Sequence, residues 1–168
     1  VGYVGADQRV MVLCVPPAGN YAIARLSSAD ESVWNDYAPE FTAATTDPNV
    51  GDAGHVLGRW VEIAPRTIAV EIDILFSGSG ISAGLGQYFI TTPFSVAERS
   101  ISAATGAVYM LDSGTANRAG IVNVTSGGDN YFITNTPSGD VDNDTPQVWA
   151  SGHAIRFTIV HEIEWSGF

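Results

Sequence analysis

Hydrophobic and polar residues alternate along much of the chain, most clearly near its C-terminal end. The last segment places Ile155, Phe157, Ile159, Ile163 and Trp165 on one face and Arg156, Thr158, Glu162 and Glu164 on the other. An earlier segment, residues 67–76, places Ile68, Val70, Ile72, Ile74 and Phe76 on one face and Glu71 and Asp73 on the other. A period of two residues is that of a β-strand with one buried face. We therefore predict two long strands that share one core.

Glycine and proline divide the remaining sequence into short segments. The chain has 18 glycines and 8 prolines, and hardly any stretch keeps the period of a helix. Shorter strands are predicted at residues 8–15, 21–26, 37–43, 56–63, 87–91, 107–111, 120–124 and 131–135. Together with the two long strands, this number is typical of a β-sandwich or a barrel. We expect an all-β protein, an antiparallel and jelly-roll-like β-sandwich.

Residues 28–36 separate an N-terminal hairpin from the rest of the chain. Ser28 and Glu31 have the spacing of a capping box, but a helix here would span barely two turns, so we interpret the segment as a junction. We predict an N-terminal hairpin or connector at residues 1–35 and a β-sandwich domain at residues 36–168. A hairpin buries little surface alone, so we expect this one to pack on a partner or a neighbouring subunit.

Charge and hydropathy exclude several classes of function. The chain carries 18 acidic and 7 basic residues and a net charge of −11, and all of its basic residues are arginines. Nucleic-acid binding is therefore not expected, because no basic stripe is available for phosphates. No apolar run approaches the roughly 20 residues of a membrane helix, so we expect no membrane insertion.

Three aromatic residues are candidates for ligand binding. Trp60 and Trp149 fall outside the predicted inward alternation, and Tyr131 opens a predicted strand. Such rings stack on sugars, but they also dominate protein cores and subunit interfaces. Both interpretations, ligand binding and packing, stay open on the sequence alone.

A run of alternating carboxylates suggests a calcium site. Asp140, Asp142 and Asp144 have the spacing that opens a calcium-binding loop, in which hard oxygen ligands surround a hard ion. Thr145 and Ser151 then stand where an EF-hand requires a glycine and a bidentate glutamate. The alternatives are a looser calcium site and a solvated acidic loop, and no other cofactor is implied.

Patterns that could support catalysis are weak. Ser82 lies in a Gly-x-Ser-x-Gly sequence, but no helix is predicted to follow it as a nucleophile elbow requires. His153 and His161 are roughly 26 Å apart along an extended strand, too far to share a metal ion. Glu71 and Asp73 have the separation of a glycosidase pair, but so would carboxylates on any solvated sheet face. We therefore expect no enzymatic activity.

Several turns and strand starts resemble a known module. These are Tyr37-Ala38-Pro39, the Thr-rich turn at Asp47-Pro48, Gly58-Arg59-Trp60, Leu111-Asp112-Ser113-Gly114-Thr115 and Trp149-Ala150-Ser151-Gly152. The pattern is similar to C-terminal β-rich domains of tailed-phage minor tail and tail-fibre proteins and covers about residues 37–164. His153 and Trp60 depart from it, in the places of an acid and a tyrosine. The resemblance implies architecture and a location in the virion, and no site residue transfers with it.

We therefore expect a non-enzymatic virion protein on the tail or capsid surface. The first hypothesis is a tail-fibre or receptor-binding tip that contacts a host-surface glycan through the loops at residues 77–86, 125–130 and 139–146. Such appendages are usually homo-oligomers, with a trimer favoured, in which several weak contacts add up. The alternatives are a decoration protein that docks only to other virion proteins and a carbohydrate-binding module.

Overall fold

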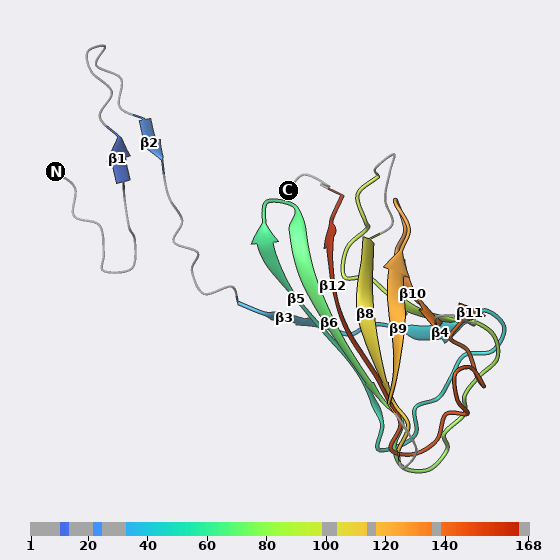
Figure 1. The fold of residues 1–168 in the computed structure, drawn as a ribbon. Helices are drawn as coiled ribbons and strands as arrows, with labels where there is room; N and C mark the ends of the chain where they lie inside the picture. The colour runs from blue at the N-terminus through green and yellow to red at the C-terminus, as the bar shows by residue number, and fades with distance from the viewer. Residues whose placement is uncertain are drawn as a thin grey trace. The chain divides into compact units, whose positions relative to one another are not determined.

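The computed structural model describes residues 33–98, 104–113, 117–135 and 139–164, together with the backbone of two short N-terminal strands. The chain divides into two units, Val1–Val33 and Trp34–Phe168. In the first unit, β1 (Met11–Leu13) pairs antiparallel with β2 (Ala22–Ala24) (Figure 1). The predicted N-terminal hairpin is therefore present, although its loop lies outside the described residues. That the two units are separate domains stays a prediction.

Within its described residues, the second unit forms one ten-stranded sheet in which all pairs are antiparallel. The strands are β3 (Asn35–Tyr37), β4 (Phe41–Ala43), β5 (His55–Ala64), β6 (Thr67–Leu75), β7 (Tyr88–Thr91), β8 (Ala104–Leu111), β9 (Asn117–Val124), β10 (Asn130–Asn135), β11 (Gly139–Asp140) and β12 (Ala154–Glu162). Their spatial order is β3-β5-β6-β12-β8-β9-β10-β7-β4, with β11 beside β10. The all-β, antiparallel fold class is confirmed. In the described ranges no helix is long and apolar enough to cross a membrane.

One segment, residues 35–43, links the two ends of the sheet order. Its first part, β3, pairs with β5, and its second part, β4, pairs with β7. Between them the Thr91 N–H donates to the Glu40 carbonyl at 3.0 Å, and the Glu40 N–H donates to Thr91 Oγ1 at 2.8 Å. The sheet therefore curls around its inner face (Figure 1). We call residues 35–43 the crossing segment.

The crossing segment corrects two predictions from the sequence. Residues 35 and 36, predicted as the end of the junction, belong to the strand β3. The single strand predicted at residues 37–43 is split at residues 38–40, where Pro39 lacks the N–H that a continuous ladder requires. A further correction lies outside the crossing segment: residues 139–140, predicted as part of a loop, form the strand β11.

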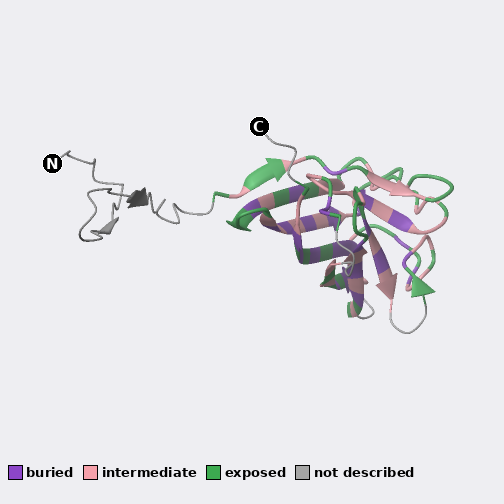
Figure 2. Cartoon of the chain, turned by 90° about the horizontal axis from the view of Figure 1, so that it is seen from above, coloured by how far each residue is buried: buried purple, intermediate pink, exposed green. Residues whose placement is uncertain are grey.

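The core lies on the inner face of the curled sheet. On β6 the residues Ile68, Val70, Ile72 and Ile74 are buried, and the positions between them are not, as the alternation predicts. Figure 2 shows the resulting bands of buried and less buried residues along the strands. The neighbouring strands contribute the further buried residues Ile155, Phe157, Ile159, Val108, Met110, Val122, Val124, Tyr131, Ile133, Tyr88 and Ile90. Trp165, predicted on the same face, lies outside the described residues.

An aromatic cluster joins the crossing segment to the core. Phe41 packs edge-on against Tyr88 with ring centroids 4.9 Å apart, and Phe76 stacks on Trp149 at 5.3 Å. The Trp149 indole N–H donates to the Asp142 carbonyl at 2.7 Å, which satisfies a polar group that would otherwise be costly to bury. The cluster thus connects a loop before β12 to β4, β7 and the end of β6.

The glycine-rich loop at residues 77–86 is paired with residues 44–54. Asn49 and Ser82 exchange two backbone hydrogen bonds, of 2.8 and 2.9 Å. The Asp52 carboxylate accepts hydrogen bonds from both the N–H and the hydroxyl of Ser79, which lowers the pKa of Asp52. Gly84 adopts a φ of +70°, and a Cβ there would overlap the Thr46 carbonyl. This loop is therefore a set of tight turns, and Ser82 has no strand-to-helix context in it.

The Gly58→Ala substitution is expected to destabilise the fold. A Cβ at Gly58 would overlap the Tyr37 ring, whose hydroxyl is anchored to the Thr91 carbonyl at 3.2 Å and which therefore cannot easily move. Overpacking of this kind costs about 1–3 kcal/mol. Urea denaturation should show that loss, and the loss should shrink when Gly58→Ala is made in a Tyr37→Ala background. Equal losses in both backgrounds would contradict the role given to the Tyr37 ring.

Candidate functional site

The registers of four adjacent strands align side chains in rows across the outer face of the sheet. Leu57 on β5 lies opposite Asp73 on β6, Asp73 opposite Arg156 on β12, and Arg156 opposite Tyr109 on β8. Because these residues alternate with buried ones, their side chains point away from the core. We call these four residues row one.

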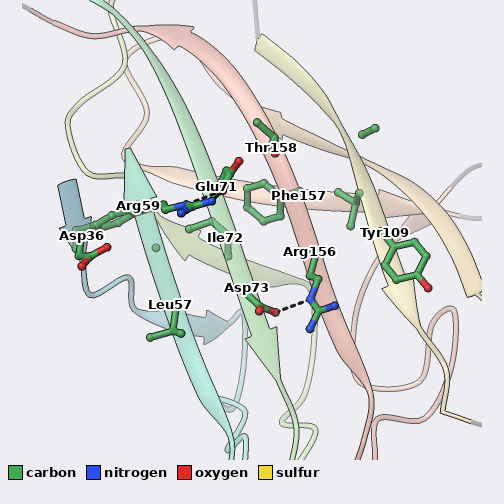
Figure 3. Close-up of a pocket in the computed structure, with 14 residues that line it drawn as sticks. Asp36, Leu57, Arg59, Glu71, Ile72, Asp73, Tyr109, Arg156, Phe157 and Thr158 are labelled. Carbon is green, nitrogen blue, oxygen red and sulfur yellow. Dashed lines mark hydrogen bonds and ion pairs between the residues drawn. The ribbon is translucent and has the colours of Figure 1, made fainter. Parts of the chain in front are cut away.

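A second row lies two residues further along each strand. Row two consists of Arg59, Glu71, Thr158 and Ala107, and Asp36 on β3 lies opposite Arg59. Its last two members are small, which leaves the surface hollowed beside Tyr109 and Arg156. Both rows line a groove of about 920 Å³ on the outer face (Figure 3). This groove is the candidate functional site.

Two arginine–carboxylate pairs form the floor of the groove. Arg59 Nε donates to Glu71 Oε2 at 2.6 Å, and Arg156 Nε donates to Asp73 Oδ1 at 2.8 Å. The Arg59 guanidinium also lies 4.7 Å from the centre of the Trp34 ring, a cation–π contact. Each arginine is thereby held in place, although its side chain stays half exposed. The groove consequently presents fixed polar groups with little net charge between them.

An exposed hydrophobic side chain stands at each end of row one. Leu57 is 57% exposed and Tyr109 is 42% exposed, and Figure 3 shows them on opposite sides of the Asp73–Arg156 pair. Three strand spacings separate β5 from β8, roughly 14 Å. A shallow surface with paired charges in its centre and apolar groups at both ends is suited to bind a flat, amphipathic ligand.

The two carboxylates that the sequence offers for glycoside hydrolysis both lie in the groove. Glu71 and Asp73 each accept a hydrogen bond from an arginine, so both take part in the ion pairs of the floor.

The three aromatic residues predicted to bind a ligand are not part of the groove. Trp149 is only 3% exposed, Tyr131 is fully buried, and both belong to the core. Trp60 lies opposite Val70 on the inner face, where its ring packs edge-on against Phe94 at 4.8 Å. These positions fit the packing alternative for the three rings. Trp149 and Tyr131 offer no ring face to solvent, and the Trp60 ring packs against Phe94.

The three histidines lie in separate environments. His55 Nε2 is 3.6 Å from Asp73 Oδ2, and His153 Nε2 is 3.5 Å from Asp112 Oδ1. His161 Nε2 lies 2.7 Å from the buried Tyr131 hydroxyl, while its Nδ1 lies 3.2 Å from the Glu162 carbonyl. This geometry indicates a neutral imidazole with the proton on Nδ1 and a hydrogen bond from Tyr131 to Nε2. Burial lowers the pKa of His161.

The three aspartates of the predicted calcium site do not converge. Within the described ranges, no group of three or more His, Cys, Asp or Glu side chains could hold a metal ion. Asp142 Oδ1 instead accepts hydrogen bonds from the N–H groups of Asp144 and Thr145, at 3.0 and 2.8 Å. Asp140 and Asp144 are exposed. The acidic loop is therefore stabilised as a turn by Asp142 in this structure.

Sequence reasoning identified only part of the groove. It placed Arg156, Thr158, Glu71 and Asp73 on the outward faces of two strands, which is correct. It did not find Leu57 or the two β8 residues, Tyr109 and Ala107. Their position beside the charged pairs depends on which strands are neighbours, and no local pattern in the sequence contains that information.

Comparisons with known proteins find no match for this chain among family models, curated proteins or solved structures. The geometry of the groove and the motifs of the sequence are therefore the observations that bear on function.

The folded state is expected to lose stability in mild acid because of His161. Burial lowers the pKa of His161 in the folded chain, whereas in the unfolded chain the imidazole titrates near its ordinary value of 6.5. The contribution of the neutral ring is therefore complete above that pH and is lost as the pH falls from there toward the folded pKa. Urea midpoints between pH 8 and pH 5 should fall less for His161→Gln than for the parent chain. An unchanged slope in His161→Gln would contradict this assignment.

Single substitutions of Asp142 and of Asp140 distinguish a structural turn from a calcium site. Asp142→Ala removes the acceptor of two backbone N–H groups and should cost about 0.5–1.5 kcal/mol of stability. Asp140→Ala, at an exposed position, should change stability by less than about 0.5 kcal/mol. Thermal unfolding in calcium and in EDTA should give the same ranking. A stabilisation by calcium that both substitutions abolish would instead support the calcium hypothesis.

Proposed function

We propose that this chain is a non-enzymatic surface protein of a tailed virus, a tail-fibre or receptor-binding tip that contacts the host envelope. The observation that carries the binding role is the outer-face groove, in which paired charges lie between Leu57 and Tyr109. Binding sites on rigid strands keep their geometry without a ligand, which lowers the entropy cost of recognition. The virion location follows from the resemblance of the turns to phage tail modules.

The positions of the resembling motifs support an architectural role for them. The turn that begins at Leu111 and the turn at residues 149–152 lie side by side, because Gln147 Nε2 donates to the Leu111 carbonyl at 3.1 Å. His153 follows the second turn and lies 3.5 Å from the Asp112 carboxylate of the first. Two motifs far apart in sequence thus join the ends of β8 and β12. Such contacts stabilise a module and place no constraint on the side chains of its outer face.

Homo-oligomerisation would compensate for the openness of the groove. A shallow site of this kind binds weakly, and repeated weak sites gain affinity when they are tethered together. We favour a trimer, as is usual for tail appendages. The loops at residues 77–86, 125–130 and 139–146 remain proposed as further display surface, although the first of them is held by its pairing with residues 44–54.

Attachment to bacterial envelopes tests the proposal. Beads coated densely with the full chain should bind intact cells of at least one strain in a panel that includes Gram-positive and Gram-negative bacteria. Leu57→Ala in the groove should reduce the number of attached cells about tenfold, whereas Val148→Ala, at a residue 70% exposed and outside the groove lining, should not. Circular dichroism and thermal unfolding of both variants control for folding. Attachment to no strain would contradict the receptor-binding role and favour a decoration protein.

A further inference from the structure

The polar floor of the groove keeps hydrogen-bonding capacity beyond its own ion pairs. A guanidinium group carries five N–H donors, and Arg156 uses only Nε in its hydrogen bond to Asp73. Its two terminal nitrogens form no hydrogen bond with the described residues. Asp73 and Glu71 each accept through one oxygen from the arginines, and carboxylate oxygens accept several hydrogen bonds. Donors and acceptors consequently lie side by side in the floor.

This combination matches ligands whose polar groups both donate and accept. A hydroxyl group does both, and two neighbouring hydroxyls on a sugar ring can accept from a guanidinium while they donate to the adjacent carboxylate. A second such pair, Arg59–Glu71, lies nearby: Glu71 is two residues from Asp73 along β6, roughly 7 Å, and Arg59 lies on the opposite side of β6 from Arg156. The floor can therefore contact more than one sugar unit of a chain.

Tyr109 supplies the apolar contact that a sugar ring also needs. Its ring is 42% exposed, and on the adjacent row Thr158 and Ala107 are small, so space is open beside it. Aromatic rings combine a large apolar face with little conformational freedom, and the hydroxyl of tyrosine remains available to solvent or ligand. Leu57, at the far end of row one, offers a second apolar surface.

Charge selects against acidic ligands. Three carboxylates, those of Asp36, Glu71 and Asp73, line the groove beside two arginines, and the whole chain carries −11. A polyanion would be repelled over long distances. A cationic ligand would gain little electrostatic attraction at the floor, because Glu71 and Asp73 already pair with arginines.

We propose that the groove binds a neutral, hydroxyl-rich oligosaccharide, with Tyr109 against the apolar face of a sugar ring and the Arg156–Asp73 pair hydrogen-bonded to its hydroxyls. The inference rests on the proposed binding role of the groove and specifies its ligand class. Affinity per site is expected to be weak, with a Kd on the order of a millimolar, because the groove is open and few groups are buried on binding.

Immobilised glycans of defined composition test this inference. The probes are neutral oligosaccharides of glucose, galactose, rhamnose or N-acetylglucosamine, and acidic ones that contain uronic or sialic acid. Beads coated with the full chain should bind at least one neutral probe. Tyr109→Ala should weaken that binding at least tenfold, Tyr109→Phe should retain it within about threefold because the ring remains, and Val148→Ala should match the parent chain.

The possible outcomes separate this inference from the proposed function. Attachment to cells without binding to any neutral probe, or binding to acidic probes alone, would overturn the inference and leave the receptor-binding role standing. If a neutral probe binds and Tyr109→Ala does not weaken that binding, the groove is not the binding site, and the inference is overturned. Failure to bind both cells and glycans would overturn the inference and the proposed function together.

Discussion

The antiparallel pairing of β6 with β12 determines both faces of the domain. Nine residue pairs, from Ala154 opposite Leu75 to Glu162 opposite Thr67, define one continuous register. A shift of β6 by one residue would place Asp73 and Glu71 inside and its four buried residues outside, so burial enforces the register strongly. The same register that encloses the core therefore sets the arginine–carboxylate pairs next to each other on the outer face. The core and the candidate site have one common origin.

Closure of the sheet depends on the crossing segment. A ten-stranded sheet that stayed open would leave two long edges with unpaired backbone groups. Here residues 35–43 pair with β5 at one end of the order and with β7 at the other. Tyr37 then occupies space on the inner side that Gly58 leaves empty, and Phe41 packs against Tyr88. The absence of a side chain at Gly58 is thus matched by the aromatic ring of Tyr37, which the neighbouring strand β3 places directly opposite it.

Most of the strands could be predicted from the sequence, but not their neighbours. Alternation located β6 and the start of β12 to within one residue, because in each of them one face is apolar and the other polar, although β12 ends at Glu162, before the predicted end of the alternation. In β5 the pattern is misleading: Leu57 faces outward, while Gly58 and Trp60 face inward. Gly58 fits the inner face because Tyr37 covers it, a contact that no reading of β5 alone could reveal. Trp60 was consequently placed outside the inward alternation, and Leu57 was missed as part of the groove.

Local motifs failed for a related reason, since a side chain takes the partner that the fold places nearest to it. The spacing of Asp140, Asp142 and Asp144 suits a metal ion, but Asp142 is occupied by backbone N–H groups of its own turn. In the groove, the opposite holds: Asp73 and Arg156 are 83 residues apart in sequence and form a direct hydrogen bond. Their pairing cancels charge locally on a strongly acidic protein, yet it preserves donors and acceptors at fixed positions. A surface built in this way can discriminate ligands by the arrangement of hydroxyl groups rather than by net charge.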